Sequence, residues 1–307
     1  MAKTIFIDGE AGTTGLQIRE KLAARPDVEL VSLPAEFRKD AAAKRELLGR
    51  VDLTILCLPD EAAKEAARLI DELGDKGPRV IDASSAHRVT PGWVYGFPEL
   101  VAGQADRVAY ARKVTNPGCH ATGAIALIRP LVEAGLIAAD SPLSITSVSG
   151  YSGGGKSMIE AYETGQAPPF EIYGLALEHK HIPEIELYSA LQVRPIFAPS
   201  VGNFRQGMLV SLPLHLDALP GRPSGVDLRA ALAAHYAGQP FIKVADAASS
   251  AAHLRLEPEA LNGTNMLEIH VFESEKRRQA VLVARFDNLG KGASGAAIQN
   301  LDLMLRS

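Results

Sequence analysis

The sequence predicts an α/β protein with two parts: a Rossmann-like, doubly wound parallel sheet, and an α+β domain whose sheet is mostly antiparallel. In the first third of the chain, short apolar runs alternate with longer amphipathic ones, which is typical of strand-helix-strand units. Strand-like segments dominate the later part. The chain has 307 residues, enough for about two domains of roughly 150 residues each.

The first third predicts four strands and two helices. A short apolar run at 4–8 leads into a glycine-rich turn, and 13–24 has helical periodicity. The run at 52–58 is nearly all apolar, as in a strand buried on both faces. The remaining predicted elements here are strands at 28–33 and 79–82 and a helix at 61–73.

The later part predicts a second sheet and a closing helix. The expected strands are 143–148, 193–200, 207–216, 266–273 and 280–286. A charged turn at 274–279 joins the last two strands. The segment 293–305 is helical in character and follows a glycine-rich turn.

The composition excludes several classes of protein. The net charge of −4 and the pI near 6.1 argue against general nucleic-acid binding. No apolar run is long enough for a transmembrane helix, so no membrane partner is expected. With only two cysteines, a disulfide framework is not expected, and a reducing, cytoplasmic setting is. No group of Cys and His residues has the spacing of a zinc site, so no metal is expected.

The glycine turn after the first predicted strand is typical of a dinucleotide site. Gly9, Gly12 and Gly15 let a phosphate approach backbone N–H groups, and a helix N-terminus adds a favourable dipole. Thr13 and Thr14 add hydroxyl donors. The spacing departs from the G-x-G-x-x-G pattern, so a turn chosen only for tight packing is the alternative.

The end of the second predicted strand favours NADP(H) over NAD(H). Ser32 stands where an acidic residue would bind the ribose hydroxyls of NAD, and Arg38 or Lys39 offers a cation for a 2′-phosphate. Glu36 is the counter-argument. A solvated charged loop is the alternative for each charged residue.

Cys119 is the candidate nucleophile. Asn116-Pro117-Gly118 predicts a turn, and the apolar segment that follows predicts a helix, so Cys119 falls in its first turn. The helix dipole and free N–H groups there stabilise a thiolate. Cys57, inside an apolar run, is interpreted as a buried strand residue without chemistry.

A cysteine nucleophile needs a partner for proton transfer. His120 is adjacent to Cys119, but neighbouring residues on a helix point in different directions. The segment 178–184 contains His179, His181 and two carboxylates, a dense cluster in a chain of eight histidines. A polar surface loop is the alternative.

Several motifs occur in order along nearly the whole chain. They are the glycine turn, the loop 84–88, the Asn116-Pro117-Gly118-Cys119 turn, and the segments 173–175, 178–184 and 288–300. Together they resemble the N-acetyl-γ-glutamyl-phosphate reductase family of arginine biosynthesis. The short chain and the segment 148–156 are similar to the shorter of its two types. The cysteine turn and the closing glycine-lysine segment are the specific motifs.

The resemblance implies a reduction of N-acetyl-L-glutamyl 5-phosphate to N-acetyl-L-glutamate 5-semialdehyde with NADPH and release of inorganic phosphate. Cys119 would form a thioester with the acyl group. His181 is the favoured acid-base, with His179 as the rival. Glu184 would orient the base or contact the substrate.

Further site residues follow from the chemistry of the substrate and cofactor. Arg88 and Arg205 suit the two anionic ends of an acyl phosphate that also carries a carboxylate. A surface ion pair is the alternative for each. Tyr151 and Tyr173 are pocket candidates, with a core role as the alternative. Lys180 stands where the longer type has an arginine, which leaves the substrate contacts less secure than Cys119.

The resemblance also assigns the domains and an assembly. Residues 1–118 and 290–307 would form the NADP-binding domain, and 119–289 the catalytic and oligomerisation domain of a homodimer or homotetramer. Ser84, Asn288 and Lys291 are the remaining expected cofactor ligands. The closing helix would pack back onto the dinucleotide domain.

Three other functions stay open at this point. Aspartate-semialdehyde dehydrogenase and a carrier-linked aminoadipate reductase are acyl-phosphate reductases of the same type. A non-catalytic dinucleotide-binding regulator is the third, and it would need no reactive thiol.

Overall fold

A computed structural model describes residues 2–38, 40–252 and 254–306 and confirms the predicted α/β class. The chain forms two compact units. The first comprises Met1–Pro98, Gly103–Pro117 and Ala293–Ser307, and the second comprises Glu99–Ala102 and Gly118–Gly292. The expected division after residues 118 and 289 therefore differs at Gly118, at 290–292 and at the short segment Glu99–Ala102.

The first unit is built on a six-stranded sheet in the order β2-β1-β3-β4-β6-β5, with every pair parallel. Its strands are β1 (Lys3–Asp8), β2 (Val28–Val31), β3 (Leu53–Leu56), β4 (Arg79–Asp82), β5 (Val94–Tyr95) and β6 (Lys113–Thr115). Its α-helices are α1 (Thr13–Ala23), α2 (Ala41–Leu48), α3 (Asp60–Glu72), α4 (Gln104–Tyr110) and α10 (Gly295–Arg306). Short 3₁₀ turns are η1 (Ala35–Phe37) and η2 (Gly74–Lys76).

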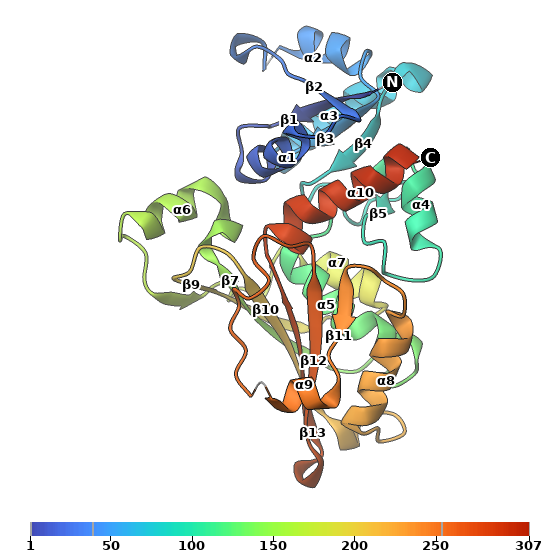
Figure 1. Ribbon diagram of the computed structural model, residues 1–307, viewed down its shortest axis with the longest axis vertical. Helices are drawn as coiled ribbons and strands as arrows, with labels where there is room; N and C mark the ends of the chain where they lie inside the picture. Colours follow the sequence, from blue (N-terminus) through green and yellow to red (C-terminus); the bar gives the residue numbers. More distant parts are fainter. Residues whose placement is uncertain (1, 39, 253, 307) are drawn as a thin grey trace. The chain divides into compact units, whose positions relative to one another are not determined.

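Helices cover both faces of this sheet because successive strand residues point to opposite sides. Ile5 of β1 belongs to a core cluster with residues of α1 and α10, whereas Phe6 belongs to a second cluster with residues of α2 and α3. Helix α10 lies beside α4 although the two are far apart in sequence (Figure 1). The prediction that the closing helix packs onto the first unit is confirmed.

Strand β1 is the point at which the strand order reverses, since the chain adds β2 on one side of it and β3 on the other. Ligands of open α/β sheets bind beyond the carboxyl ends of the strands at such a point. The glycine turn begins directly after Asp8, the last residue of β1. The fold therefore places this turn where a nucleotide is expected.

The second unit contains a seven-stranded sheet in the order β11-β12-β13-β10-β7-β9-β8. Its strands are β7 (Ser144–Gly150), β8 (Phe170–Ile172), β9 (Ile196–Gly202), β10 (Met208–His215), β11 (Ile242–Val244), β12 (Leu267–Ser274) and β13 (Gln279–Phe286). The pairs β7–β9 and β11–β12 are parallel and the other four are antiparallel. The prediction of a mostly antiparallel sheet is confirmed.

Helix α5 (Cys119–Glu133) packs on β10 and β13 of the second unit. The remaining helices are α6 (Gly155–Glu163), α7 (Ile182–Ser189), α8 (Gly225–His235) and α9 (Ala247–Ala252), with turns η3 (Tyr151–Gly154), η4 (Leu216–Ala218), η5 (Glu275–Arg277) and η6 (Gly290–Ser294). In α5, a Cβ on Gly123 would lie 2.6 Å from a Val210 methyl, so this glycine lets the helix approach β10 closely.

In the first unit, two predicted strands are shorter than expected, and strands β5 and β6 and helices α2 and α4 were not predicted. Strand β2 ends at Val31 rather than at 33, and β3 ends at Leu56, so Cys57 follows the strand instead of lying in it. Helix α2 has a single buried residue, Leu48, and so lacks the apolar stripe that reveals a helix in sequence. Among the described residues, no helix has the length and apolar character needed to cross a membrane.

Candidate active site

In the glycine turn between β1 and α1, backbone atoms lie very close to two of the three glycines. Gly9 has a φ of +90°, and a Cβ there would lie 2.3 Å from the carbonyl oxygen of Cys57. A Cβ on Gly15 would lie 2.4 Å from the carbonyl oxygen of Gly9. At Gly12, the N-cap of α1, the nearest atom would be 3.4 Å away. Tight packing thus accounts for Gly9 and Gly15, whereas the fold does not require a glycine at 12.

A cavity of about 340 Å³ lies over this turn, between the end of β1 and helices α2 and α3. This volume is within the range of small-molecule sites, roughly 300–1,000 Å³. Leu33, Leu58 and Leu69 form apolar walls, and the turn supplies backbone groups at Gly9 to Ala11. The arrangement fits the adenosine half of a dinucleotide, with the base against apolar side chains and a phosphate at the turn.

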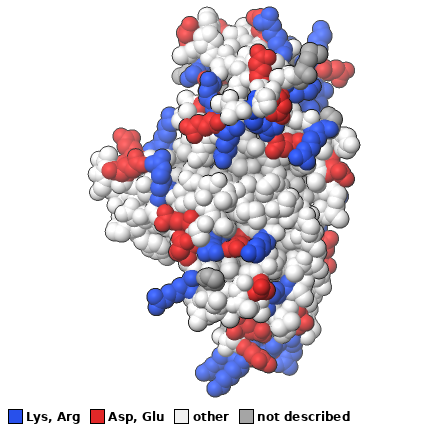
Figure 2. Space-filling model, in the orientation of Figure 1, with Lys and Arg blue, Asp and Glu red and all other residues white. Residues whose placement is uncertain are grey.

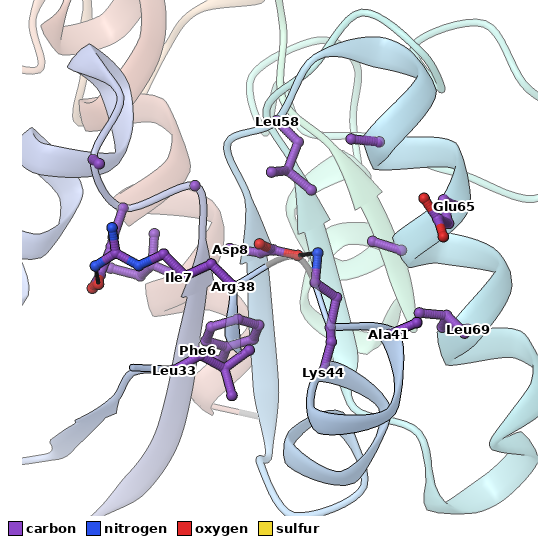
Figure 3. Close-up of a pocket in the computed structure, with 15 residues that line it drawn as sticks. Phe6, Ile7, Asp8, Leu33, Arg38, Ala41, Lys44, Leu58, Glu65 and Leu69 are labelled. Atoms are coloured by element: carbon purple, nitrogen blue, oxygen red, sulfur yellow. Dashed lines mark hydrogen bonds and ion pairs between the residues drawn. The ribbon is translucent and has the colours of Figure 1, made fainter. Parts of the chain in front are cut away.

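Lys44 of α2 reaches across the cavity to the end of β1 (Figure 3). Its Nζ lies 2.7 Å from Oδ2 of Asp8. Burial raises the pKa of the Asp8 carboxyl, and the hydrogen bond and charge of Lys44 oppose that shift. The cavity therefore contains a partly buried cation already paired with a carboxylate.

Ser32 and Arg38 both contact Glu10 of the glycine turn. Their contact with a 2′-phosphate stays a prediction. Arg38 Nη2 lies 2.8 Å from Glu10 Oε1, and Ser32 Oγ donates to Glu10 Oε2 at 2.9 Å. Arg19 of α1 also pairs with Glu10 and donates to Ser32 Oγ at 2.9 Å. Lys39, the alternative cation, lies outside the described residues, and Glu36 is exposed.

The loop after β4 is organised by the carboxylate of Asp82. Ser84 Oγ donates to Asp82 Oδ2 at 2.8 Å, and His87 Nδ1 lies 2.6 Å from the same oxygen. Arg88 is buried, and its Nε donates to the carbonyl oxygen of Asn116 at 3.2 Å. Arg88 is therefore no surface ion pair. Its anion-binding role and the cofactor contact of Ser84 stay predictions.

Cys119 is the first residue of α5, directly after the N-cap Gly118. The side chain is partly exposed and forms no disulfide with Cys57. The N–H of Gly118 donates to Oε2 of Glu184, at a distance of 3.2 Å. A Cβ on Gly292 would lie 2.8 Å from the Cβ of Cys119, so the η6 backbone passes close to the cysteine. The expected helix-mouth position of Cys119 is confirmed.

Three histidines gather beside this helix mouth. The ring centroids of His179 and His181 are 4.7 Å apart, and each is 5.5 Å from the ring of His120. His181 is buried at the start of α7, and its backbone N–H donates to Nδ1 of His179 at 3.2 Å. The cluster lies beside the start of α5, since His120 directly follows Cys119 and helix α7, which begins at Ile182, packs against α5.

His120 points into the protein and forms a chain of hydrogen bonds. Its Nδ1 lies 2.8 Å from Ser147 Oγ, and its Nε2 lies 2.8 Å from the hydroxyl of Tyr173. Burial lowers the pKa of His120 to about 3, with further contributions from His179 and Lys180. The pKa of Tyr173 is raised by its own burial, and then by Cys119. His120 is therefore a neutral imidazole that fixes the Tyr173 hydroxyl.

The other predicted ligands have protein partners of their own. Arg205 is exposed and forms an ion pair with Glu163, and the ring of Tyr151 stacks on that of Tyr162 with centroids 4.9 Å apart. Asn288 is buried and donates to Ser152 Oγ at 3.0 Å. The proposed substrate and cofactor contacts of these three residues stay predictions.

Lys291 is buried in the second unit, where its Nζ lies 2.7 Å from Oε1 of Glu99. Burial lowers the pKa of Lys291, and the charge of Glu99 opposes this. The ammonium thus has a carboxylate partner within the protein. A contact with the cofactor stays a prediction.

Four residues near the predicted site were not singled out from the sequence. They are Glu10, Lys44, His120 in its contact with Tyr173, and Gly292. Glu10 was visible as the one charged residue inside the glycine turn. The contacts of the other three join residues distant in sequence, and no local pattern reveals them.

Two family models match most of the chain. The NAD binding domain of semialdehyde dehydrogenases matches residues 4–108, and their dimerisation domain matches residues 119–288. The chain belongs to the semialdehyde dehydrogenase family. Solved structures of semialdehyde dehydrogenases share its fold. Aspartate semialdehyde dehydrogenase II of Vibrio cholerae, in complex with ASA, has a TM-score of 0.74 at 14% identity and covers 100% of this chain and 99% of its own.

A second structure, aspartate semialdehyde dehydrogenase with NADP from Candida albicans, has a TM-score of 0.66 at 15% identity, with 99% of each chain covered. Closer semialdehyde dehydrogenase relatives are named N-acetyl-gamma-glutamyl-phosphate reductase. That of Burkholderia cenocepacia is 53% identical over 98% of this chain and 97% of its own. That of Chelativorans sp. is 53% identical over 99% of each. The resemblance drawn from the motifs is confirmed.

Proposed function

We propose that the chain reduces N-acetyl-L-glutamyl 5-phosphate to N-acetyl-L-glutamate 5-semialdehyde with NADPH, releasing phosphate, as a step of arginine biosynthesis. The observation that carries the proposal is Cys119, partly exposed at the mouth of α5 beside the histidine cluster. The names of relatives about 53% identical over nearly the whole chain support the choice of substrate.

Cys119 attacks the acyl carbon of the substrate as a thiolate. The helix N-terminus stabilises the negative charge on sulfur, and a free thiolate is the nucleophilic form. A sulfur–carbon bond forms and the bond from carbon to the phosphate oxygen breaks. Phosphate leaves with the bonding electron pair, which leaves a thioester on Cys119. Splitting the reaction in this way replaces one hard step by two easier ones.

His181 is the residue we assign to proton transfer. Nδ1 of His179 accepts a hydrogen bond from the backbone N–H of His181, so a neutral His179 carries its ring proton on Nε2. Its Nε2 is therefore not free to accept a proton from Cys119. His181 has no such restriction in this contact. It takes the thiol proton of Cys119, which leaves the thiolate. It would give that proton to the tetrahedral oxygen when the thioester is reduced, and take it back as the thiohemiacetal collapses to the aldehyde and the Cys119 thiolate.

Glu184 and Tyr173 position the reacting groups. Glu184 holds the N–H of Gly118, one residue before Cys119, and it lies one helical turn after His181. This contact couples the start of α5 to the start of α7. The Tyr173 hydroxyl is held by His120 and keeps its proton, because burial, and then the Cys119 charge, raise its pKa. Arg88 and Arg205 are the candidates for the two anionic ends of the substrate.

The cavity and glycine turn of the first unit fit a dinucleotide, as the apolar walls and close backbone approach indicate. NADPH, when bound, supplies the hydride that reduces the thioester. Thr13 and Thr14, in the first turn of α1, would offer N–H and hydroxyl donors to the diphosphate. Gly12, without a side chain, would let the phosphate approach. Ser32 and Arg38 would hold the 2′-phosphate. A reactive thiol and NADPH chemistry suit a cytoplasmic location, and the dimerisation-domain match supports a homodimer or homotetramer.

The reverse reaction tests the proposal. Purified protein receives N-acetyl-L-glutamate 5-semialdehyde, NADP⁺ and phosphate, with aspartate semialdehyde as the control substrate. We expect NADPH formation that depends on phosphate and strongly favours the acetylated substrate. Cys119→Ala is expected to lower the rate by at least about 1,000-fold, whereas Cys57→Ala keeps it. Equal rates with aspartate semialdehyde, or an active Cys119→Ala variant, would contradict the proposal.

A further inference from the structure

A carboxylate occupies the cationic corner of the cofactor cavity. Glu10 accepts from Arg38 at 2.8 Å and from Ser32 at 2.9 Å, and it also pairs with Arg19. We call these four residues the Glu10 cluster. Glu10 and Arg38 line the cavity, and the Glu10 side chain is only 15% exposed while the two arginines are about half exposed. The Glu10 cluster therefore forms part of the cavity wall, with a mostly buried carboxylate at its centre.

The donors of this cluster are the ones that a 2′-phosphate needs. Guanidinium groups bind carboxylates and phosphates with the same planar geometry, so one anion competes with the other for Arg19 and Arg38. A hydroxyl donor, Ser32, completes the set on either anion. A 2′-phosphate reaching these donors must displace the Glu10 carboxylate or lie beside a like charge, and both reduce its affinity.

We propose that Glu10 determines cofactor specificity as an internal anion that competes with the 2′-phosphate of NADPH. The proposal rests on the assignment of NADPH in the proposed function and adds that Glu10 weakens the binding of NADPH. With no 2′-phosphate present, Glu10 keeps the two arginines and Ser32 paired. When NADPH binds, its phosphate takes over these donors. When NADP⁺ leaves, the carboxylate re-forms its bonds, which favours release of the product cofactor.

The position of Glu10 links this exchange to the phosphate-binding turn. Glu10 directly follows Gly9, whose carbonyl oxygen accepts the N–H of Gly12 at 3.0 Å. The residue that leaves the cluster therefore belongs to the backbone segment that receives the diphosphate. An NAD-type cofactor has no group to displace Glu10, so its affinity is not reduced by this competition.

Two nucleotides that differ only in the 2′-phosphate test the proposal without any turnover. Adenosine 2′,5′-bisphosphate and adenosine 5′-monophosphate are titrated into the full-length protein by calorimetry, at low and at high salt. The test variant is Glu10→Gln, which keeps the size of the side chain and removes its charge. The matched control is Glu20→Gln, which makes the same charge change at an exposed position of α1, next to Arg19 and outside the cavity.

We expect Glu10→Gln to bind the bisphosphate about tenfold more tightly, since two exposed ion pairs are each worth at most about a fivefold factor. Its affinity for the monophosphate is expected to stay within about twofold of the parent, and the gain is expected to shrink at high salt. Glu20→Gln is expected to change neither affinity by more than about twofold.

Other outcomes overturn the proposal in distinguishable ways. If the parent prefers the bisphosphate and Glu10→Gln does not increase that preference, Glu10 does not compete and the NADPH assignment stands. Weaker monophosphate binding by Glu10→Gln would make Glu10 a ribose ligand instead. If neither parent nor variant distinguishes the two nucleotides, both the competition and the NADPH assignment fail.

Discussion

Adjacent residues at the start of α5 have opposite surroundings. Cys119 is partly exposed at the helix mouth, whereas His120 is 3% exposed and hydrogen-bonded through both ring nitrogens. The cysteine position follows from local signals, because a proline-glycine turn and the apolar segment after it define the helix start. The surroundings of His120 do not, since Ser147 and Tyr173 are 27 and 53 residues away in sequence.

The buried His120 predicts a specific loss of stability in acid. Its pKa is about 3 in the folded chain against 6.5 for the free side chain, so the unfolded chain binds more protons between these values. The stability contributed by the neutral imidazole is present above pH 6.5 and is lost as the pH falls toward 3. Between pH 7 and 4.5 this amounts to about 2–3 kcal/mol in the free energy of unfolding.

The variant His120→Asn removes this titration and is expected to lose about 2–3 kcal/mol less than the parent over the same pH range. Urea unfolding at pH 7 and pH 4.5 measures the difference. His215→Asn is the control, because His215 lies on the exposed side of β10. Identical acid losses in the parent and in His120→Asn would show that His120 does not become buried in a neutral form.

At the scale of elements, Gly9 and Gly12 of the same turn have different roles, because packing requires a glycine at position 9 and does not at position 12. Gly9→Ala places a Cβ 2.3 Å from a backbone oxygen at a φ of +90° and is expected to lower the free energy of unfolding by about 2–4 kcal/mol. Gly12→Ala meets only ordinary contacts, so about 1 kcal/mol or less is expected.

Cofactor affinity separates the two tasks further. If a phosphate approaches the turn at Gly12, Gly12→Ala weakens NADPH binding by about tenfold while the protein remains stable. Thermal unfolding and a calorimetric titration with NADPH give the two readouts. A stable Gly12→Ala variant with parental affinity would remove Gly12 from the phosphate site.

The elements that sequence reasoning found are those whose patterns are local. Residues 4–8, 79–82 and 280–286 are strands because their apolar residues pack in a sheet, and the structure has β1, β4 and β13 there. Helix α2 has no such pattern. Strand β2 ends at Val31, and Leu33, which the apolar run includes, lines the cavity instead. The Glu184 contact with Gly118 spans 66 residues and has no local sign in the sequence.

At the scale of the whole molecule, the chain enters the second unit twice. Glu99–Ala102 joins the second unit between two stretches of the first, and the buried pair of Glu99 and Lys291 accounts for this. His235 also contacts the carbonyl oxygen of Leu100, at 3.1 Å. On the face shown in Figure 2, Lys and Arg side chains are interspersed with Asp and Glu rather than gathered by sign.

The buried pair predicts a strong effect of removing one partner. Lys291→Met leaves the Glu99 carboxylate buried without its cation and is expected to cost about 3–5 kcal/mol in the free energy of unfolding. The double variant Glu99→Gln/Lys291→Met removes both charges and is expected to recover part of that loss. Denaturant unfolding measures both. A stable Lys291→Met variant with weakened NADPH binding would instead support Lys291 as a cofactor ligand.

The nucleophilic role of Cys119 is tested most directly by trapping the acyl group on the protein. The protein is mixed with N-acetyl-L-glutamyl 5-phosphate without NADPH, quenched in acid and digested, and its peptides are weighed by mass spectrometry. The account predicts an N-acetylglutamyl adduct on the peptide that carries Cys119, absent from Cys119→Ala and from the Cys57 peptide. No adduct at Cys119 under conditions in which phosphate is released, or equal labelling of Cys57, would contradict it.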